Sequence, residues 1–275
     1  TKTFSYPSPR RDDSVKDDFY GTEISDPYRW MEDPNSEETA QFVKQQQEIT
    51  TPFLDSLDHR EQVKEKLTNY YNYEKVGCPF RRGDRYYFYK NTGLQNQSVM
   101  YYRTSLDGEA KVFVDPNTWS EDGTTSIGSS AFSEDASIVL FSISEKGSDW
   151  KTVKFRKVEE DDFMEETLEW IKFSSFAWTH DNRGIFYASF EKPAEIEAGA
   201  DKGTEGTQNK NHKLYYHVLG TPQEEDHMIY SAPEFPDRMW NAEVSDDGKY
   251  LLISVRESCE PKNLLYYADL SSFDG

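Results

Sequence analysis

The residues best suited to chemistry in this 275-residue chain are five histidines and two cysteines, and they form no catalytic or metal-binding motif. There is no G-x-S-x-G nucleophile elbow, no H-E-x-x-H, no phosphate-binding loop and no C-x-x-C pair. The histidines show no metal-ligand spacing, so we expect each to have an ordinary surface or turn role. They are His59, His180, His212, His217 and His227.

Acidic residues dominate the charge of the chain. It has 51 Asp and Glu against 31 Lys and Arg, a net charge of −20 and a pI near 4.7. This balance argues against nucleic acid and anionic membranes as partners. The acidic clusters at 159–162 and 224–226 are typical of charged turns. Cys78 and Cys259, far apart in so long a chain, favour a reducing compartment over a disulfide scaffold, so we expect a cytoplasmic protein.

One short phrase recurs three times and indicates the elements that position these residues. It reads AFSEDASIVLFS from Ala131, AWTHDNRGIFYA from Ala177 and EVSDDGKYLLIS from Glu243. Each copy has a Ser or Thr, an Asp two residues later and then an apolar run rich in β-forming residues. We therefore predict a repeated strand-turn-strand unit, with the Asp side chain bonded to the backbone of its own turn.

The spacing of the copies predicts a β-propeller. Asp135 and Asp181 are 46 residues apart, close to the length of a four-stranded blade. Asp247 follows after 66 residues, and the excess is explained by residues 192–211, a polar, Gly-containing segment expected to form a mobile loop. Strand-like runs fill the intervals. We count about four blade-like units between Gly77 and Gly275 and predict a mainly β fold.

The first seventy residues have a different character. Residues 4–34 are rich in Pro, Asp and aromatic residues and are expected to form an extended arm. A helix is predicted after Pro34, with Asn35 as its N-cap, and a second helix follows. Two apolar stripes at helical spacing are expected to pack into a core. They comprise Phe42, Val43, Ile49, Phe53 and Leu57, and then Val63, Leu67, Tyr70 and Tyr71.

Seven phrases resemble the prolyl oligopeptidase family, in order, from about Tyr6 to Leu270. They are DPYRWMEDP, NTGLQNQSVMYYR, AFSED, GSDWKTVKF, IKFSSFAWTHD, KLYYHVLGT and AEVSDDGKYLLISVRESC. The resemblance implies an α/β-hydrolase domain, split in the sequence, with a seven-bladed propeller inserted into it. Residues 1–74 would then be the N-terminal arm of the hydrolase domain, and residues 75–275 about the first four blades. The resemblance places the catalytic Ser, Asp and His outside this sequence.

The same resemblance implies that four residues of this chain contact a peptide substrate: Phe173, Met239, Arg256 and Cys259. Phe and Met offer adaptable apolar surface, and Arg offers a fixed positive charge with a planar set of donors. From the residues alone, Phe173 and Met239 would instead be blade core and Cys259 an ordinary buried thiol.

The resemblance implies a monomeric serine endopeptidase that cleaves short proline-containing peptides after proline, with the propeller as a lid that excludes folded proteins. It implies no cofactor and no metal. Two alternatives stay open: a propeller adaptor without enzymatic activity, and a relative that ligates or cyclises peptides through the same acyl-enzyme chemistry.

Overall fold

The computed structural model describes residues 4–193 and 208–273, and the chain divides into two compact units. The first unit ends at Tyr71 and the second begins at Asn72. Most of the predicted mobile loop, residues 194–207, lies outside the described residues. In the part of the chain that is described, no helix has the length and apolar character needed to span a bilayer.

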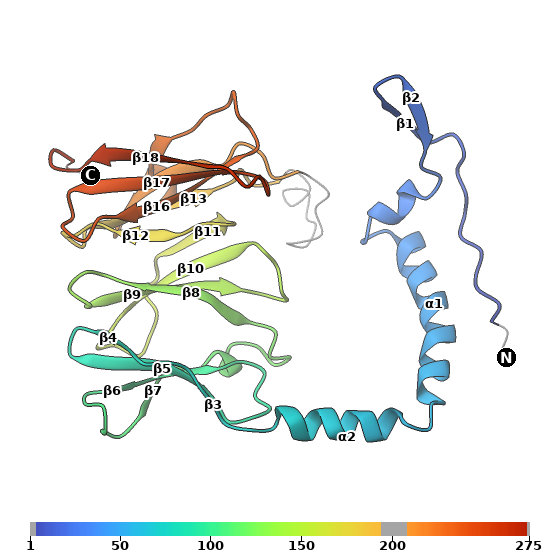
Figure 1. The fold of residues 1–275 in the computed structure, drawn as a ribbon, viewed down its shortest axis with the longest axis horizontal. Coiled ribbons are helices and arrows are strands. Elements are labelled where there is room, and N and C mark those ends of the chain that lie inside the picture. The colour runs from blue at the N-terminus through green and yellow to red at the C-terminus, as the bar shows by residue number, and fades with distance from the viewer. Residues whose placement is uncertain (1–3, 194–207, 274–275) are drawn as a thin grey trace. The chain divides into compact units, whose positions relative to one another are not determined.

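The first unit contains a β-hairpin followed by helices (Figure 1). Its elements are β1 (Lys16–Phe19), β2 (Thr22–Ser25), the 3-10 helix η1 (Arg29–Glu32), α1 (Glu37–Asp55) and α2 (Arg60–Tyr71). The N-cap of α1 is Ser36, because its hydroxyl accepts the Thr39 N–H at 3.2 Å. The prediction of Asn35 is therefore wrong by one residue, since Asn35 lies outside the helix.

The apolar stripes predicted for the helical region form no buried core: Phe42, Ile49 and Phe53 are partly buried and the remaining members are exposed. Val43, Val63 and Leu67 expose about half of their area, and no side chain of α2 is buried. The prediction that these stripes pack into a core is wrong for this chain. An exposed apolar surface of this kind marks a region that packs against another surface.

The second unit consists, within the described residues, of four antiparallel sheets in chain order (Figure 1). The first contains β3 (Lys75–Val76), β4 (Phe80–Arg82), β5 (Arg85–Asn91), β6 (Val99–Arg103) and β7 (Lys111–Val114). The second contains β8 (Ser126–Phe132), β9 (Ile138–Ser144), β10 (Lys151–Lys157) and β11 (Thr167–Ile171). The third contains β12 (Phe176–Trp178), β13 (Gly184–Ser189), β14 (Lys213–Val218) and β15 (His227–Tyr230). The fourth contains β16 (Arg238–Val244), β17 (Tyr250–Glu257) and β18 (Asn263–Asp269).

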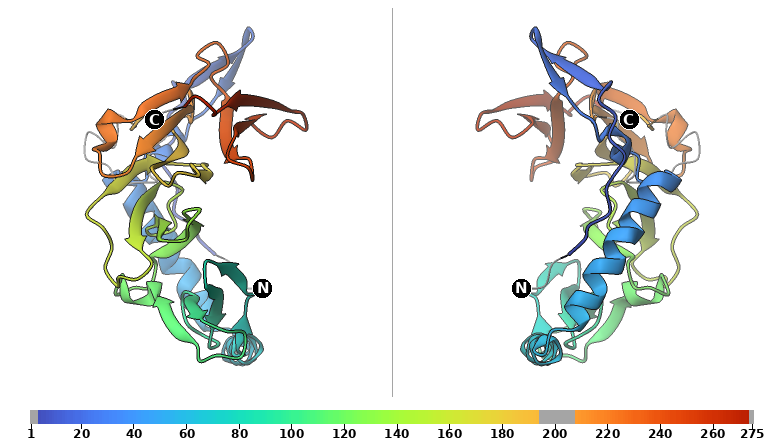
Figure 2. Two further views of the ribbon diagram at one scale, coloured as in Figure 1. Left: turned by 90° about the vertical axis from the view of Figure 1, so that its left-hand side faces the viewer. Right: turned by 90° about the vertical axis from the view of Figure 1, so that its right-hand side faces the viewer.

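Two short 3-10 helices, η2 (Pro116–Thr118) and η3 (Gln223–Glu225), lie between strands. Figure 2 shows the sheets from the side, following one another from cyan through green and orange to red. The apolar core lies between successive sheets because each strand sends alternate side chains to its two faces. On β13, for example, Phe186 packs toward the fourth sheet and Tyr187 toward the second. These stacked antiparallel sheets confirm the mainly β prediction and are consistent with a β-propeller domain.

The repeated phrase forms the same hairpin in the second, third and fourth sheets, as predicted. In each copy the Asp accepts the backbone N–H two residues further on, at 2.9 to 3.1 Å. The residue directly after the Asp has a left-handed backbone in every copy, with φ between 58° and 72°. The turn begins at Ser133, Thr179 or Ser245, each of which also donates its N–H to the carbonyl five residues further on. The turn therefore depends on local bonds that its own residues supply.

Candidate functional site

Met239 and Arg256 are direct neighbours across a strand pair. Met239 lies on β16 and Arg256 on β17, and the antiparallel register places them opposite each other. Such partners have their Cβ atoms about 5 Å apart. Met239 is partly buried and Arg256 is exposed. The end of this hairpin therefore presents a flexible apolar side chain beside a guanidinium.

Phe173 lies in the linker between β11 and β12, with a left-handed backbone (φ 58°) and a side chain that is 49% exposed. A bulky residue rarely adopts this conformation, and such outliers concentrate at functional sites. The ring meets Phe190 edge-on at 6.5 Å between centroids, and the Lys172 ammonium lies 5.5 Å from its centre. The expectation from the residues alone, that Phe173 is blade core, does not fit this exposure.

The Phe173 linker is hydrogen-bonded to the strand that carries Met239. Ser175 donates its backbone N–H to the Asn241 side chain at 3.1 Å. The Ser175 hydroxyl also donates to the Ala242 carbonyl and accepts the Ala242 N–H, both at 2.8 Å. The structure thus joins the segment of Phe173 to the Met239–Arg256 hairpin, although 66 residues of sequence separate Phe173 from Met239.

Cys259 lies in the turn after β17, three residues beyond Arg256. The thiol is exposed and unpaired, as is that of Cys78. The interpretation of Cys259 as a buried thiol is therefore wrong. No described contact joins Cys259 to Phe173 or Met239, so it is the least firmly anchored of the four predicted residues.

His212 is a second link between the two segments, and sequence reasoning missed it. It directly precedes β14 and is 1% exposed. Its Nδ1 accepts the Trp240 N–H at 3.0 Å, and its Nε2 lies 3.2 Å from the Lys172 carbonyl. Burial lowers the pKa of His212 to about 4, so the imidazole is neutral at pH 7. The predicted surface or turn role is wrong because strands distant in sequence cover the ring.

His217, at the other end of β14, is also fully buried but lies between two carboxylates. Nδ1 is 2.6 Å from Asp226 Oδ1 and Nε2 is 2.6 Å from Glu166 Oε1. Burial alone would lower the pKa of His217, but hydrogen bonds to Asp226 and Glu166 outweigh it and raise the pKa to about 9. The surface prediction is wrong here too. Asp226, predicted to belong to a charged turn, has a side chain that is only 2% exposed.

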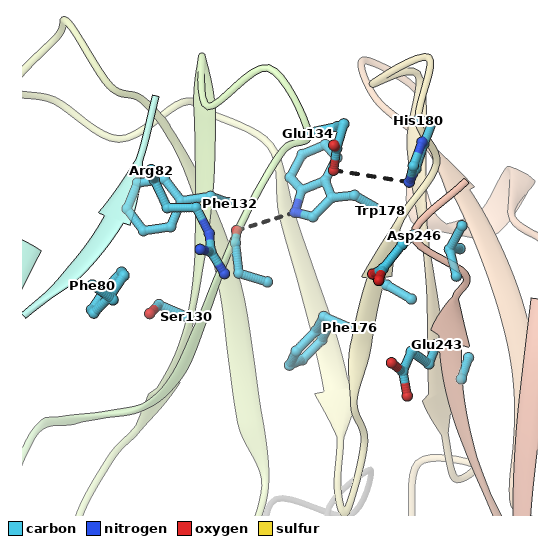
Figure 3. Close-up of a pocket in the computed structure, with 14 residues that line it drawn as sticks. Phe80, Arg82, Ser130, Phe132, Glu134, Phe176, Trp178, His180, Glu243 and Asp246 are labelled. Atoms are coloured by element: carbon cyan, nitrogen blue, oxygen red, sulfur yellow. Dashed lines mark hydrogen bonds and ion pairs between the residues drawn. The ribbon is translucent and has the colours of Figure 1, made fainter. Parts of the chain in front are cut away.

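A hollow of about 660 Å³ is lined by residues of β4, β8, β12 and β16 and of the turns that follow the last three (Figure 3). Three residues from equivalent turn positions line it: Glu134, His180 and Asp246, each directly before the repeated Asp. His180 Nε2 and Glu134 Oε2 are 3.9 Å apart, the pair joined by a dashed line in Figure 3. The sequence analysis used the repeated Asp and did not consider the residue directly before it. Its equivalent position in the three copies was the signal that could have identified these lining residues. In the described segments, residues 4–193 and 208–273, no cluster of His, Cys, Asp or Glu has the arrangement of a metal site.

Comparison with known proteins gives consistent matches over nearly the whole chain. Residues 7–274 match the family model described as "Prolyl oligopeptidase, N-terminal beta-propeller domain". A prolyl endopeptidase of Elizabethkingia meningoseptica is 41% identical over 259 residues, covering 94% of this chain and 36% of that protein. A prolyl endopeptidase of Elizabethkingia miricola is 38% identical over 272 residues, covering 99% and 37%.

A solved structure shows the same fold. Prolyl oligopeptidase B from Galerina marginata, bound to a 35mer hydrolysis and macrocyclization substrate, has a TM-score of 0.82 and 29% identity. The match covers 98% of this chain and 40% of that one. This chain thus spans little more than a third of the length of the curated relatives it matches.

Proposed function

This chain belongs to the prolyl oligopeptidase family and carries the N-terminal β-propeller domain of that family, and from this membership we propose that the whole protein is a serine endopeptidase that cleaves short peptides after proline. The observation that carries the proposal is the 41% identity to a prolyl endopeptidase along 94% of the chain. The chemistry belongs to the remainder of the protein. A Ser there attacks the carbonyl of the proline residue, with His as base and Asp as orienter.

The role proposed for this chain is that of a lid with a peptide-contacting edge. Phe173, Met239, Arg256 and Cys259 contact the bound peptide. Support comes from the bonds of Ser175 to β16, which join the Phe173 linker to the Met239–Arg256 hairpin. Phe173 and Met239 supply apolar surface for a peptide side chain, and Arg256 a fixed positive charge for its carbonyl or carboxylate oxygens.

The exposed stripes of α1 and α2 support the proposal that residues 1–74 are the N-terminal arm of an α/β-hydrolase domain. Val63 and Leu67 would be covered by the rest of that domain in the whole protein. The sheets of residues 75–275 are then about the first four of seven blades. We further propose a cytoplasmic monomer without cofactor. The unpaired Cys78 and Cys259 support the reducing compartment.

Peptide ligation or macrocyclisation is the second candidate, supported by the likeness to the Galerina marginata enzyme and its bound substrate. Hydrolysis and ligation share an acyl-enzyme intermediate and differ in whether water or an amine accepts the acyl group. A propeller adaptor without activity is the third candidate, and a Ser nucleophile elsewhere in the protein would exclude it.

The deciding experiment uses the whole protein and two peptides that differ only in having Pro or Ala at one position. Mass spectrometry of the products should show cleavage after Pro and none after Ala. Cyclic or joined products as the main outcome would favour ligation. No product from either peptide would overturn the enzymatic proposal.

The place of Cys259 is tested by maleimide labelling, with Cys78 as the matched control because both thiols are exposed and unpaired. A bulky maleimide should inhibit the wild type and the Cys78→Ser variant, but not Cys259→Ser. A substrate-like inhibitor should slow labelling of Cys259 alone. Unchanged inhibition in Cys259→Ser would remove this residue from the site.

A further inference from the structure

The buried imidazole of His212 connects two backbone amide groups, one next to Phe173 and the other next to Met239. The carbonyl near His212 Nε2 belongs to the peptide bond between Lys172 and Phe173. The N–H that His212 Nδ1 accepts belongs to the peptide bond between Met239 and Trp240. The ring therefore spans the gap between the backbone of Phe173 and the backbone of Met239.

We propose that His212 is a positioning residue of the peptide site, whose neutral imidazole, protonated on Nε2, fixes Phe173 relative to Met239. This inference rests on the proposed function. His212 contacts no substrate in this proposal and acts through Phe173.

The tautomer follows from the partners. A backbone N–H can only donate, so the Trp240 N–H requires a lone pair on His212 Nδ1. A carbonyl can only accept, so the Lys172 carbonyl requires the ring proton on Nε2. Only the neutral Nε2–H form satisfies both groups. The indole Nε1–H of Trp240 donates to the His212 carbonyl at 2.5 Å and holds the backbone of His212 in place as well.

The packing around the ring extends this link to Phe173 itself. Phe190 lies 4.3 Å from the imidazole between centroids and meets the Phe173 ring edge-on. Phe173 has a backbone conformation that non-glycine residues avoid, so both of its flanks need to be held. Ser175 holds the following flank to β16, and His212 holds the preceding one. Loss of the hydrogen bond to the Lys172 carbonyl would therefore loosen the link between the segment before Phe173 and the strand of Met239.

Two conservative variants separate the two bonds of the ring. In His212→Gln the side-chain amide nitrogen reaches the position of Nε2 and keeps the donor for the Lys172 carbonyl. In His212→Asn the side-chain oxygen takes the position of Nδ1 and keeps the acceptor for Trp240, but the bond to Lys172 is lost. In the whole protein we expect His212→Asn to raise KM for a proline peptide about tenfold with kcat nearly unchanged. His212→Gln should raise it less than about threefold.

Tyr187→Phe is the matched control for loss of stability. Tyr187 is buried on β13 of the same sheet, and its hydroxyl donates to Asp226 Oδ2 at 2.6 Å and accepts from Gln223 Nε2 at 3.1 Å. Asp226 is a partner of His217 and not of His212. This variant loses both hydrogen bonds of the hydroxyl and should lower the unfolding temperature with KM unchanged. If Tyr187→Phe raises KM as much as His212→Asn does, the effect of His212 is general destabilisation and the proposal fails.

A double variant tests whether His212 acts through Phe173. On a Phe173→Ala background, His212→Asn should leave KM unchanged, because the side chain to be positioned is already absent. Additive effects of the two substitutions would overturn the proposal.

Amide hydrogen exchange gives a readout that does not depend on activity. In His212→Asn the amides of residues 173–176 should exchange faster than in the wild type, with β9 and β10 unchanged. No change there overturns the positioning role even if the peptidase is active. If the wild type cleaves no proline peptide but exchange increases as expected, the proposed function fails and the link between His212 and the Phe173 segment stands.

Discussion

The two ends of β14 each carry a buried histidine, and the two imidazoles differ in charge. His212 directly precedes β14 and His217 lies near the other end of that strand, and both are buried. The ring nitrogens of His212 are hydrogen-bonded only to backbone groups, and its pKa is lowered to about 4. His217 contacts Asp226 and Glu166 and has a pKa raised to about 9. At pH 7 one ring is neutral and the other is an imidazolium.

The difference shows that partners, rather than burial, decide the charge of a buried histidine. Desolvation disfavours the cation at both positions. At His217 two carboxylates outweigh that cost, whereas at His212 only the hydrogen bond to the Lys172 carbonyl opposes it. The neutral ring can then use one nitrogen as an acceptor, which a cation cannot do. The same residue type therefore forms a neutral hydrogen-bonded link between backbone groups at one end of the strand and an ionic link between carboxylates at the other.

The largest expected effect is on stability. His217→Gln leaves the buried carboxylates of Asp226 and Glu166 without a cation and should lower the unfolding free energy at pH 7 by about 3–5 kcal/mol. His212→Gln should cost about 1 kcal/mol, because only a neutral hydrogen bond is lost. Urea unfolding of the whole protein, followed by tryptophan fluorescence, measures both. Equal losses would remove the contrast between the two ends.

The next effect concerns alkaline pH. Between pH 6.5 and about 9 the folded protein keeps a proton on His217 that the unfolded chain has released. The unfolding free energy should therefore fall as pH rises through this range, with the contribution of His217 complete below pH 6.5. Subtracting the urea-unfolding curve of His217→Gln from that of the wild type isolates the effect. A difference that is flat from pH 7 to pH 10 would show that His217 is not a cation in the folded protein.

The opposite dependence is expected for His212 at acidic pH. Its lowered pKa means that, between pH 6.5 and about 4, the unfolded chain binds a proton that the folded protein does not. The contribution of His212 is complete above pH 6.5 and is lost as pH falls through about 4. The difference between wild type and His212→Gln should shrink on acidification. A difference that grows instead would contradict the neutral ring.

The smallest effect on the unfolding free energy is expected for Glu166→Gln. This variant tests which of the two carboxylates is the main partner of the His217 imidazolium. Glu166 Oε1 accepts from Gly220 and His217, and a Gln oxygen keeps both bonds. Glu166 Oε2 is buried without a hydrogen-bond partner in the described parts of the chain. We expect a change of less than about 1 kcal/mol, because Asp226 still neutralises the ring.

Nuclear magnetic resonance titration of His217 measures this directly. The pKa of His217 in Glu166→Gln should stay above 6.5. A loss of stability as large as that of His217→Gln would make Glu166, rather than Asp226, the main partner.

The sequence was sufficient for those parts of the fold that depend on neighbours along the chain. The turn after Ser133 could be predicted because Asp135 bonds the N–H of Ser137, two residues away. The same pattern at Asp181 and Asp247 revealed the repeat and hence the stacked sheets. The hairpin of β1 and β2 was missed, because residues 16–25 show no apolar alternation that would mark a strand.

The buried histidines could not be predicted, because their surroundings come from distant residues. His212 is bonded to groups 40 and 28 residues away, at Lys172 and Trp240. His217 is paired with Glu166, 51 residues earlier. The pairing of Met239 with Arg256 follows once the hairpin is placed, but the approach of Phe173 depends on Ser175 reaching β16. Periodicity along one strand contains no information about such contacts.

The repeated turn leaves one side chain in each copy free to vary, and these side chains line the hollow. Its bonds use the Ser or Thr at the start, the Asp and the backbone, and none of them needs the side chain between those two residues. That intermediate position is Glu134 in one copy, His180 in the next and Asp246 in the third, all facing the same hollow. Each of these three sheets thus offers one place where charge, size and shape can change while the hairpin stays folded. Evolution can diversify the lining of the hollow residue by residue, and a combinatorial library at these three positions would explore the same freedom.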